Sequence, residues 1–297
     1  MKRIILMIVF IFTLTSCGKD NSEIKNEDFS KTFTDVGEIT NKYINIEQDA
    51  KKNMISIMND NKNYHAKIRS VDEKELKSNI NKNLNKNKKL QWVLDNFDKF
   101  SHIEKVLVGN DIDTVDFLYN LYNDKTNFNF FYGQSINLGR KTPYYVQWDN
   151  RWAYDEIIEN ETIGISGCGP TSMAMVLSRL LKDKKINPRI ISQDAKNYMT
   201  HEGISWSFFK NESDKYGIKT KEINNDEKEI RNALRKGPLI VSVHHGYFTT
   251  GGHIMVIDSY ENGKLLINDP NSVKNSKLNW YYDDIKDQIA NVWAFSK

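Results

Sequence analysis

The sequence predicts an α+β fold in which a mainly helical N-terminal region precedes a domain of mixed helices and strands. Apolar residues between Val36 and Ile46 recur at steps of three and four positions, which is the spacing of an amphipathic helix. In the second half of the chain, helical patterns come first and apolar strand patterns follow, an order typical of helices packed on an antiparallel sheet. With 297 residues, 39% of them hydrophobic, the chain can bury one core of ordinary domain size and a second, smaller element.

The N-terminus carries the pattern of a secretory signal. The basic pair Lys2-Arg3 precedes an apolar run, Ile4 to Phe12, that is shorter than the roughly 20 residues a membrane-spanning helix needs. The next residues, Leu14-Thr15-Ser16-Cys17, resemble the lipobox of bacterial lipoproteins, in which the cysteine is acylated. We expect residues 1–17 to be a lipoprotein signal peptide, with Cys17 lipidated and the protein anchored on the extracytoplasmic face of the cell membrane. An ordinary cleaved signal or an uncleaved anchor is the alternative.

The cysteine count and the charge narrow the possible functions. The chain has two cysteines, so with Cys17 assigned to the lipid, Cys168 has no partner for an internal disulfide. An unpaired thiol in an exported protein is expected to be either reactive or buried. The net charge is +3, and loss of Lys2 and Arg3 with the signal leaves +1. A nearly neutral chain without a basic stripe predicts no nucleic-acid partner.

Composition divides the rest of the chain into three parts. Residues 18–31 are polar and predict a flexible tether. Residues 32–127 are rich in Lys, Asn, Asp and Glu and predict a helical stalk or regulatory region, with a break at Lys82–Lys89 and a helical pair from Leu90 to about Tyr122. This region either lifts the following domain off the membrane or covers its functional site. Residues 128–297 are denser in aromatic side chains and form the expected functional domain.

Capping residues and apolar runs place the elements of this domain. Pro170–Leu181 is nearly all apolar on its inner faces and is expected to be a buried helix. Asn187-Pro188 is a cap and first turn that predicts a helix to about Met199, and helices that end at a glycine are expected at Ser205–Tyr216 and Glu227–Lys236. Apolar segments predict strands at Leu239–His244, His253–Tyr260, Lys264–Asn268 and Val292–Phe295.

The motif Gly167-Cys168-Gly169-Pro170-Thr171-Ser172 predicts a reactive thiol. Pro170 fits the first turn of a helix, which places Cys168 at the helix N-terminus. There the macrodipole and the free backbone N–H groups favour a thiolate and lower the pKa of the cysteine. The same N–H groups can stabilise an oxyanion after the thiolate attacks a carbonyl. The alternative is a small cysteine buried beneath a helix start.

His253 is the candidate base among the six histidines. It follows Gly251-Gly252 and opens an apolar strand, which can hold an imidazole rigidly against the helix N-terminus. The His244-His245 pair lies at a strand end without a carboxylate or cysteine cluster, so we expect no metal and no cofactor. The remaining histidines are expected to be solvated or to lie in a loop; they are His65, His102 and His201.

Asp269 is the candidate group to orient the imidazole, because it ends the strand expected to pair with the strand of His253. Asn262-Gly263 marks the turn between the two strands. A regular two-residue turn would place position 253 opposite 272 and Asp269 on the other face. A three-residue loop or a β-bulge would restore the same face, and we therefore predict one of these irregularities. Asn268 and Asp258 are the fallback candidates.

Four segments together resemble the C39-like family of papain-fold cysteine peptidases. The segments are Gln147-Trp148-Asp149-x-Arg151-Trp152, the Gly-Cys-Gly-Pro-Thr-Ser motif, Phe248-Thr249-x-Gly251-Gly252-His253 and Asn268-Asp269-Pro270-Asn271. The resemblance covers about Tyr144 to Phe295. It implies a papain-like fold, with the nucleophile helix packed on an antiparallel sheet that carries His and Asp. It also implies that Gln147 is the oxyanion-hole glutamine and that the insertion Ala153–Ser166 loops out.

The sequence as a whole predicts a cell-surface, thiol-dependent peptidase that acts through Cys168, His253 and Asp269 and forms an acyl-enzyme. Its expected partners are a peptide, protein or cell-wall peptide substrate and, through the lipid anchor, the membrane. Two alternatives stay open: a peptidoglycan amidase or endopeptidase, and a surface lipoprotein that binds a ligand without catalysis.

Overall fold

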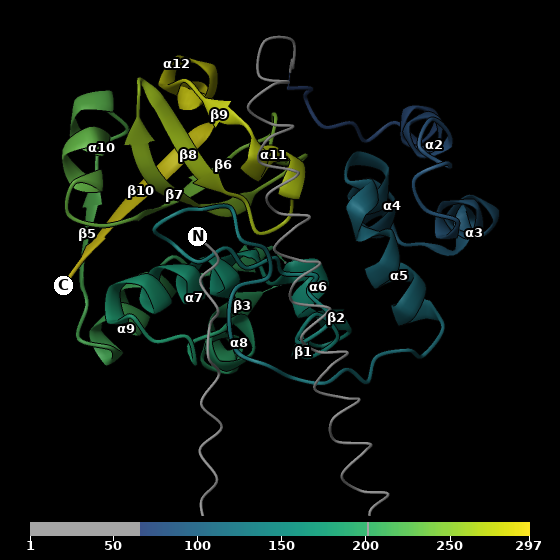
Figure 1. The fold of residues 1–297 in the computed structure, drawn as a ribbon, viewed down its shortest axis with the longest axis horizontal. Coiled ribbons are helices and arrows are strands. Elements are labelled where there is room, and N and C mark those ends of the chain that lie inside the picture. The colour runs from purple at the N-terminus through teal and green to yellow at the C-terminus, as the bar shows by residue number, and fades with distance from the viewer. Residues whose placement is uncertain (1–65, 201) are drawn as a thin grey trace, which may run out of the picture. The chain divides into compact units, whose positions relative to one another are not determined.

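The computed structural model describes residues 66–200 and 202–297 (Figure 1). These residues fall within one compact unit that spans 47–297. The expected signal peptide with Cys17, the tether, the apolar pattern from Val36 to Ile46, His65 and His201 lie outside the described residues. Within the described part of the chain, no helix is both long enough and apolar enough to cross a membrane.

The first part of the described chain is helical, as expected. Its α-helices are α2 (Glu73–Asn81), α3 (Lys89–Asp95), α4 (His102–Asn110) and α5 (Val115–Tyr122), with 3-10 turns at Phe97–Lys99 and Ile112–Thr114. The predicted break lies between α2 and α3, but the predicted helical pair from 90 to 122 is wrong. A capping box explains the extra helix: Ser101 accepts from the Glu104 N–H, and the Glu104 carboxylate accepts from the Ser101 N–H.

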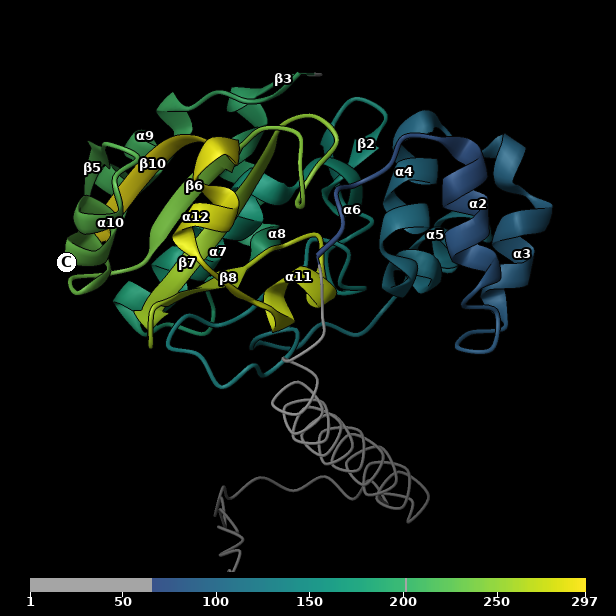
Figure 2. The same ribbon diagram turned by 90° about the horizontal axis from the view of Figure 1, so that it is seen from above.

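These helices share one apolar cluster with the segment that follows them. Helices α2 to α5 lie side by side in Figure 2 and bury Leu76, Val93 and Phe117 between them. Ala153 joins the same cluster. A Cβ added to Gly164 would lie 2.4 Å from the ring of Phe117, so the close approach of the two segments requires glycine there.

A six-stranded antiparallel sheet follows, with strand order β5-β10-β6-β7-β8-β9. Its strands are β5 (Lys219–Ile223), β6 (Leu239–Val243), β7 (His253–Glu261), β8 (Lys264–Asn268), β9 (Asn279–Trp280) and β10 (Ile289–Ser296). The predictions for β6, β7 and β8 are confirmed to within one residue. The predicted last strand is part of the longer β10, and β5 and β9 were not predicted.

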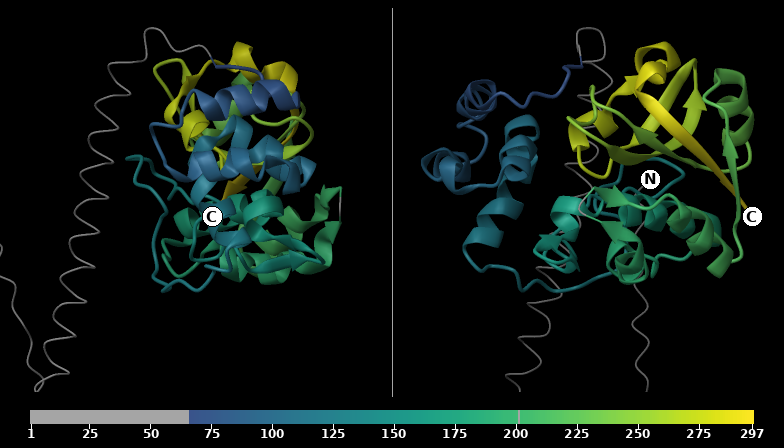
Figure 3. Two further views of the ribbon diagram at one scale, coloured as in Figure 1. Left: turned by 90° about the vertical axis from the view of Figure 1, so that its right-hand side faces the viewer. Right: turned by 180° about the vertical axis from the view of Figure 1, so that it is seen from behind.

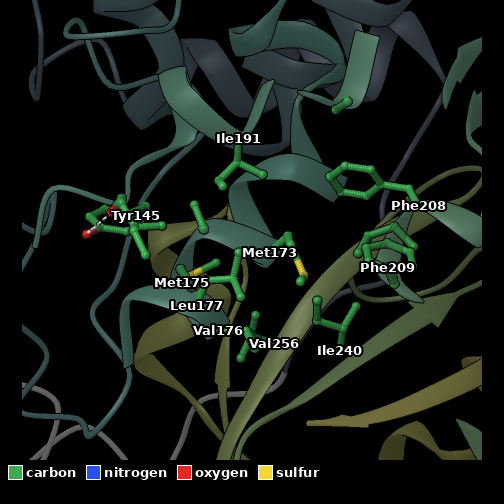
Figure 4. Packing of buried hydrophobic residues seen from close by; sticks show 14 of the residues in the cluster. Tyr145, Met173, Met175, Val176, Leu177, Ile191, Phe208, Phe209, Ile240 and Val256 are labelled. Atoms are coloured by element: carbon green, nitrogen blue, oxygen red, sulfur yellow. Dashed lines mark hydrogen bonds between the residues drawn. The ribbon is translucent and has the colours of Figure 1, made fainter. Parts of the chain in front are cut away.

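Helices cover both faces of this sheet (Figure 1 and Figure 3). Alternate residues of β6 and β7 belong to different clusters: Ile240 and Val256 to one, Val241 and Ile257 to the other. The first cluster includes side chains from α7 (Cys168–Leu181), α8 (Pro188–Ala195) and α9 (Ser207–Lys215), as Figure 4 shows. The second includes side chains from α10 (Glu227–Leu234) and α12 (Tyr282–Ile285). The architecture is therefore a mixture of helices and sheet, with α7 held between the sheet and its neighbouring helices.

Capping signals place most helix ends, with local differences. The Asn187 side chain accepts from the Ile190 N–H at the start of α8, but α8 ends at Ala195 because a 3-10 turn follows. Gly217, at φ 67°, follows the end of α9. Helix α7 begins at Cys168, two residues before its predicted start. The remaining short elements are β1 (Glu156–Ile158), β2 (Glu161–Thr162), α6 (Ile163–Ser166), β3 (Met199–Thr200), β4 (Gly203–Ile204) and α11 (Val273–Lys277).

Candidate active site

Cys168 is the first residue of α7, a helix of 14 residues. Gly167 is its N-cap and supplies no side-chain hydrogen bond, so no cap side chain competes for the first backbone N–H groups. The thiol is free and partly exposed. A positive helix end therefore lies next to the thiol of a partly exposed residue.

His253 is the first residue of β7 and lies next to the start of α7. The Ser172 hydroxyl of α7 donates to the Ile254 carbonyl at 3.3 Å, which ties the helix to the strand. The imidazole is buried, and its Nε2 lies 2.8 Å from Oδ1 of Asp269, whose side chain is fully buried. The structure thus brings Cys168, His253 and Asp269 together at one end of the sheet.

The register between β7 and β8 decides whether Asp269 can share a face with His253. The Asn262-Gly263 turn is a two-residue turn with both residues at positive φ, 51° and 82°. This conformation suits the twist of an antiparallel hairpin. A regular ladder from that turn would leave Asp269 on the opposite face.

A β-bulge in β7 changes this register. The pairing shifts between Ile257 and Ser259 and leaves Asp258 as the extra residue. Continued along the strands, the shifted register places His253 opposite position 271, on the same face as Asp269. The predicted irregularity is confirmed, and it lies within the strand rather than in the turn.

Asp258, one of the two fallback candidates, holds this bulge. Its carboxylate accepts from the Thr142 N–H at 2.7 Å, from Arg179 Nη1 at 3.2 Å and from the Ser259 hydroxyl at 3.0 Å. The other fallback candidate, Asn268, accepts from Arg140 at 2.6 Å and donates to the Thr142 carbonyl. Both side chains are therefore engaged in structural contacts, and it is Asp269 that contacts the imidazole.

The Asp269 carboxylate is held on both oxygens. Its Oδ1 also accepts from the backbone N–H groups of Asn271 at 2.9 Å and Ser272 at 3.2 Å, and its Oδ2 accepts from Asn275 Nδ2 at 3.2 Å. Burial raises the pKa of Asp269, but the charge and hydrogen bond of His253 outweigh burial and hold the pKa below its ordinary value. The carboxylate is therefore ionised and fixed in direction.

The thiol and the imidazole shift each other's pKa in opposite directions. Burial raises the pKa of Cys168, but the hydrogen bond and charge of His253, with the Ile254 and Gly169 N–H groups, lower it further than burial raises it. Burial lowers the pKa of His253, but the charge and hydrogen bond of Asp269, aided by Cys168, raise it to about 10. The electrostatics of the site therefore favour a proton on the imidazole rather than on the thiol.

Gln147 is buried beside this group of residues, but its amide is already engaged. Its Nε2 donates to the carbonyls of Gly164 at 3.1 Å and Ile165 at 3.0 Å, and its Oε1 is buried without a hydrogen-bond partner. Its backbone N–H donates to the Pro270 carbonyl at 2.8 Å. The predicted insertion Ala153–Ser166 thus does more than loop out, because it contributes the α6 carbonyls that hold this amide.

The other histidines of the described chain do not join the site. His102, His244 and His245 are exposed. Among residues 66–200 and 202–297, no group of three or more His, Cys, Asp or Glu side chains is arranged to hold a metal ion.

Several residues that fix the site were missed at the sequence level. Asn275 and Ser276, in α11, hold the Asp269 side chain and its backbone N–H, and the Tyr144 hydroxyl donates to the Asp269 carbonyl at 2.8 Å. Ser272 is the N-cap of α11, and the spacing of Ser272 and Asn275 after Asp269 is the signal that predicts a short capped helix here.

Comparison with known proteins gives one family match and two likenesses to solved structures. No curated protein matches the chain. The peptidase domain of Streptococcus ComA, described as a bi-functional ABC transporter involved in a quorum-sensing pathway, matches at 17% identity over 43% of this chain and 90% of that domain, with a TM-score of 0.36. The peptidase domain of Streptococcus mutans ComA matches at 17% identity over 44% and 93%, with a TM-score of 0.33. The model of the Peptidase_C39 like family matches residues 140–297, which is more than half of the chain, and the chain therefore belongs to this family.

Proposed function

We propose that residues 128–297 form a papain-like cysteine peptidase domain that cleaves amide bonds through Cys168, His253 and Asp269. The observation that carries this proposal is the buried His253–Asp269 contact of 2.8 Å beside a partly exposed thiol at the start of α7. Membership of a peptidase family supports a peptide or protein as the substrate.

In the resting enzyme, Cys168 is a thiolate and His253 an imidazolium. The pKa of His253, raised to about 10, keeps the imidazole protonated near neutral pH, and the lowered pKa of Cys168 favours the thiolate beside it. The nucleophile is thus formed before the substrate arrives. Asp269 keeps the imidazolium charged and oriented through the hydrogen bond to Nε2.

Catalysis then proceeds in two stages. The Cys168 thiolate attacks the substrate carbonyl carbon and forms a tetrahedral intermediate with an oxyanion. His253 gives its proton to the leaving amine, the C–N bond breaks, and an acyl-enzyme remains. Water then attacks the thioester after losing a proton to His253, and the carboxylic acid product leaves as the thiolate is regenerated.

Two groups are suited to stabilise the oxyanion. The backbone N–H of Cys168 lies at the first turn of α7, where helix geometry leaves N–H groups without intrahelical acceptors. Gln147 is the second group, but both carbonyls that accept from its Nε2 belong to α6. In our proposal one of those hydrogen bonds is released when the oxyanion forms.

The proposed location rests on the sequence. Residues 1–17 act as a lipoprotein signal peptide, Cys17 carries the lipid, residues 18–31 form the tether, and residues 32–127 form the helical region that connects the anchor to the peptidase domain. The enzyme then meets peptides outside the cytoplasm, at the membrane surface. Palmitate labelling that disappears in Cys17→Ser tests the anchor.

Activity assays with the two cysteines exchanged separately test the proposed reaction. The full chain in detergent is incubated with casein and, in parallel, with purified cell walls, and new amino groups are measured. We expect Cys168→Ala to abolish the release of amino groups. The matched control Cys17→Ser, which lacks the proposed lipid site, should retain it. Full activity in Cys168→Ala would refute the proposal. Release from cell walls but not from casein would identify a peptidoglycan amidase or endopeptidase.

A further inference from the structure

A buried ion pair from the helical region lies behind the active site. Arg69, which precedes α2, and Asp111, which follows α4, are 7% and 5% exposed. Arg69 Nη2 lies 2.5 Å from Asp111 Oδ2. Both residues precede position 140, where the match to the family model begins, so they are not part of the matched peptidase domain.

Asp111 contacts the turn that carries Asp269. The Ser272 hydroxyl donates to Asp111 Oδ1 at 2.5 Å. The backbone N–H of the same serine donates to Asp269 Oδ1, at 3.2 Å, which is the oxygen that contacts His253. Asp111 therefore fixes Ser272, and Ser272 in turn fixes the Asp269 carboxylate that orients His253.

The Ser272 hydroxyl has a second role in the same turn. It accepts from the Asn275 N–H at 3.2 Å and so caps α11. Asn275 Nδ2 in turn donates to Asp269 Oδ2 at 3.2 Å. Both oxygens of Asp269 are thus fixed by residues whose positions depend on Ser272.

Arg69 also contacts the segment that leads into His253. Its backbone N–H donates to the Gly246 carbonyl at 2.9 Å, in the loop before β7. The next residue, Tyr247, accepts from Asn275 Nδ2 at 3.1 Å. The segment around Arg69 therefore contacts the approach to the base as well as, through Asp111, the turn of the orienting carboxylate.

The charges in this buried region balance only if Arg69 is present. Burial raises the pKa of Asp111, and the negative charge of Asp269 raises it further, whereas the charge of Arg69 lowers it. The charge of Arg69 also helps to lower the pKa of Asp269. Without Arg69, the two buried carboxylates would repel each other, with His253 as the remaining cation beside Asp269.

We propose that Arg69 and Asp111 are positioning residues of the active site, which makes the helical region a working part of the peptidase and not only a connection to the membrane. The inference rests on the proposed function, because it concerns the alignment of Asp269 with His253. Loss of the ion pair leaves the side chain that accepts from Ser272 without the contact that fixes its position. The 269–272 turn is then held less firmly, and the support that the imidazolium gives to the thiolate weakens.

The test is the rate of Cys168 alkylation by iodoacetamide against pH, measured on the full chain. We expect Arg69→Met to slow labelling at pH 7 on the order of 3- to 30-fold and to move the labelling curve to higher pH, as coupling energies of contacting residues imply. Arg69→Met/Asp111→Asn removes both charges, so it folds without a lone buried carboxylate, and it should show the same direction of shift. Arg69→Lys keeps the positive charge but loses the planar guanidinium, so its labelling rate should lie between those of Arg69→Met and wild type.

Lys105→Met is the matched control. It removes an ion pair with Glu73 that joins α4 to α2 and does not contact the 269–272 turn. Labelling of this variant should match wild type. If Arg69→Met or the double variant is folded and labels like wild type over the whole pH range, the inference is wrong. If wild type itself labels slowly, the proposed function fails first, so the two failures are distinguishable.

Discussion

The two ends of the β7–β8 hairpin are built on different principles. At one end, Asn262-Gly263 forms a two-residue turn that is exposed to solvent and determined by two adjacent residues. At the other end, His253 and Asp269 are buried and fixed by contacts from α11, Tyr144 and the helical region. One end follows local turn rules, and the other depends on residues far apart in the sequence.

The bulge at Asp258 connects the two ends. The turn alone sets a register that would separate Asp269 from His253, and the bulge changes it by one residue. In this hairpin the local turn fixes the strand pair, and the bulge at Asp258 changes which residues share a face.

The largest effect is expected at the buried end, from Asp269→Asn. The amide removes the negative charge that raises the pKa of His253 to about 10, so the imidazolium loses its proton at lower pH. We expect kcat/KM to fall on the order of 10²- to 10⁴-fold, by analogy with loss of the orienting aspartate in a serine-protease triad. Because the pKa of His253 is raised to about 10, we expect the alkaline limb of the wild-type pH profile there, and in Asp269→Asn it should move to lower pH. The control Asp283→Asn removes a surface carboxylate paired with Lys286 and should change neither quantity. An unmoved alkaline limb in Asp269→Asn would contradict the assigned role.

The next largest effect is expected from Gln147→Ala. Gln147 lies against the 269–272 turn, because its backbone N–H donates to the Pro270 carbonyl. If the amide stabilises the oxyanion, kcat should fall on the order of 10²- to 10³-fold with little change in KM. Gln147→Glu keeps the size, loses the donor and adds a charge, so its loss should be at least as large. Wild-type kcat in Gln147→Ala would mean that the amide serves only the α6 carbonyls.

A smaller effect, on stability, is expected at the bulge from Asp258→Ala. The substitution leaves the Thr142 N–H without its acceptor and Arg179 without its carboxylate, which should cost about 2–4 kcal/mol of unfolding free energy. Asp258→Asn keeps an acceptor for Thr142 and should cost less. Urea denaturation measures both variants. Equal stability of Asp258→Ala and wild type would show that the register does not depend on this side chain.

The smallest effect is expected at the exposed turn, from Gly263→Ala. An added Cβ meets no atom within 4 Å, so the cost is only the strain of a positive φ, about 1 kcal/mol. Gly251→Ala is the control, because its Cβ also meets nothing and its φ is not positive. Thermal unfolding should show a lower midpoint for the first variant and no loss for the second, with peptidase activity retained in Gly263→Ala. A loss of activity there would mean that the turn also sets the site.

Local sequence rules predicted the parts of the fold that adjacent residues determine. Apolar runs predicted β6, β7 and β8, and capping residues predicted the start of α8 and the end of α9. Strand β5 was missed because its sequence, Lys219-Thr220-Lys221-Glu222-Ile223, is mostly polar and it becomes a strand through pairing with β10 at the sheet edge.

The candidate site was predicted in part, for physical reasons that differ between residues. Cys168 and His253 carry local signals, a helix start and a strand start. The bulge was required by the position of Asp269, but nothing in the sequence placed it at Asp258. Arg69 and Asp111 could not be found, because they are far apart in the sequence and only the tertiary fold buries them against each other.

The most direct test of the account is the pH dependence of iodoacetamide labelling of Cys168 in wild type and in His253→Ala. We expect fast labelling of wild type well below the ordinary thiol pKa of about 8.5. In His253→Ala the curve should move up towards that value, because the main groups that lower the pKa of Cys168 are the hydrogen bond and charge of His253. Slow labelling at neutral pH in both proteins would contradict the account, since Cys168 would then be a structural thiol without a thiolate–imidazolium pair.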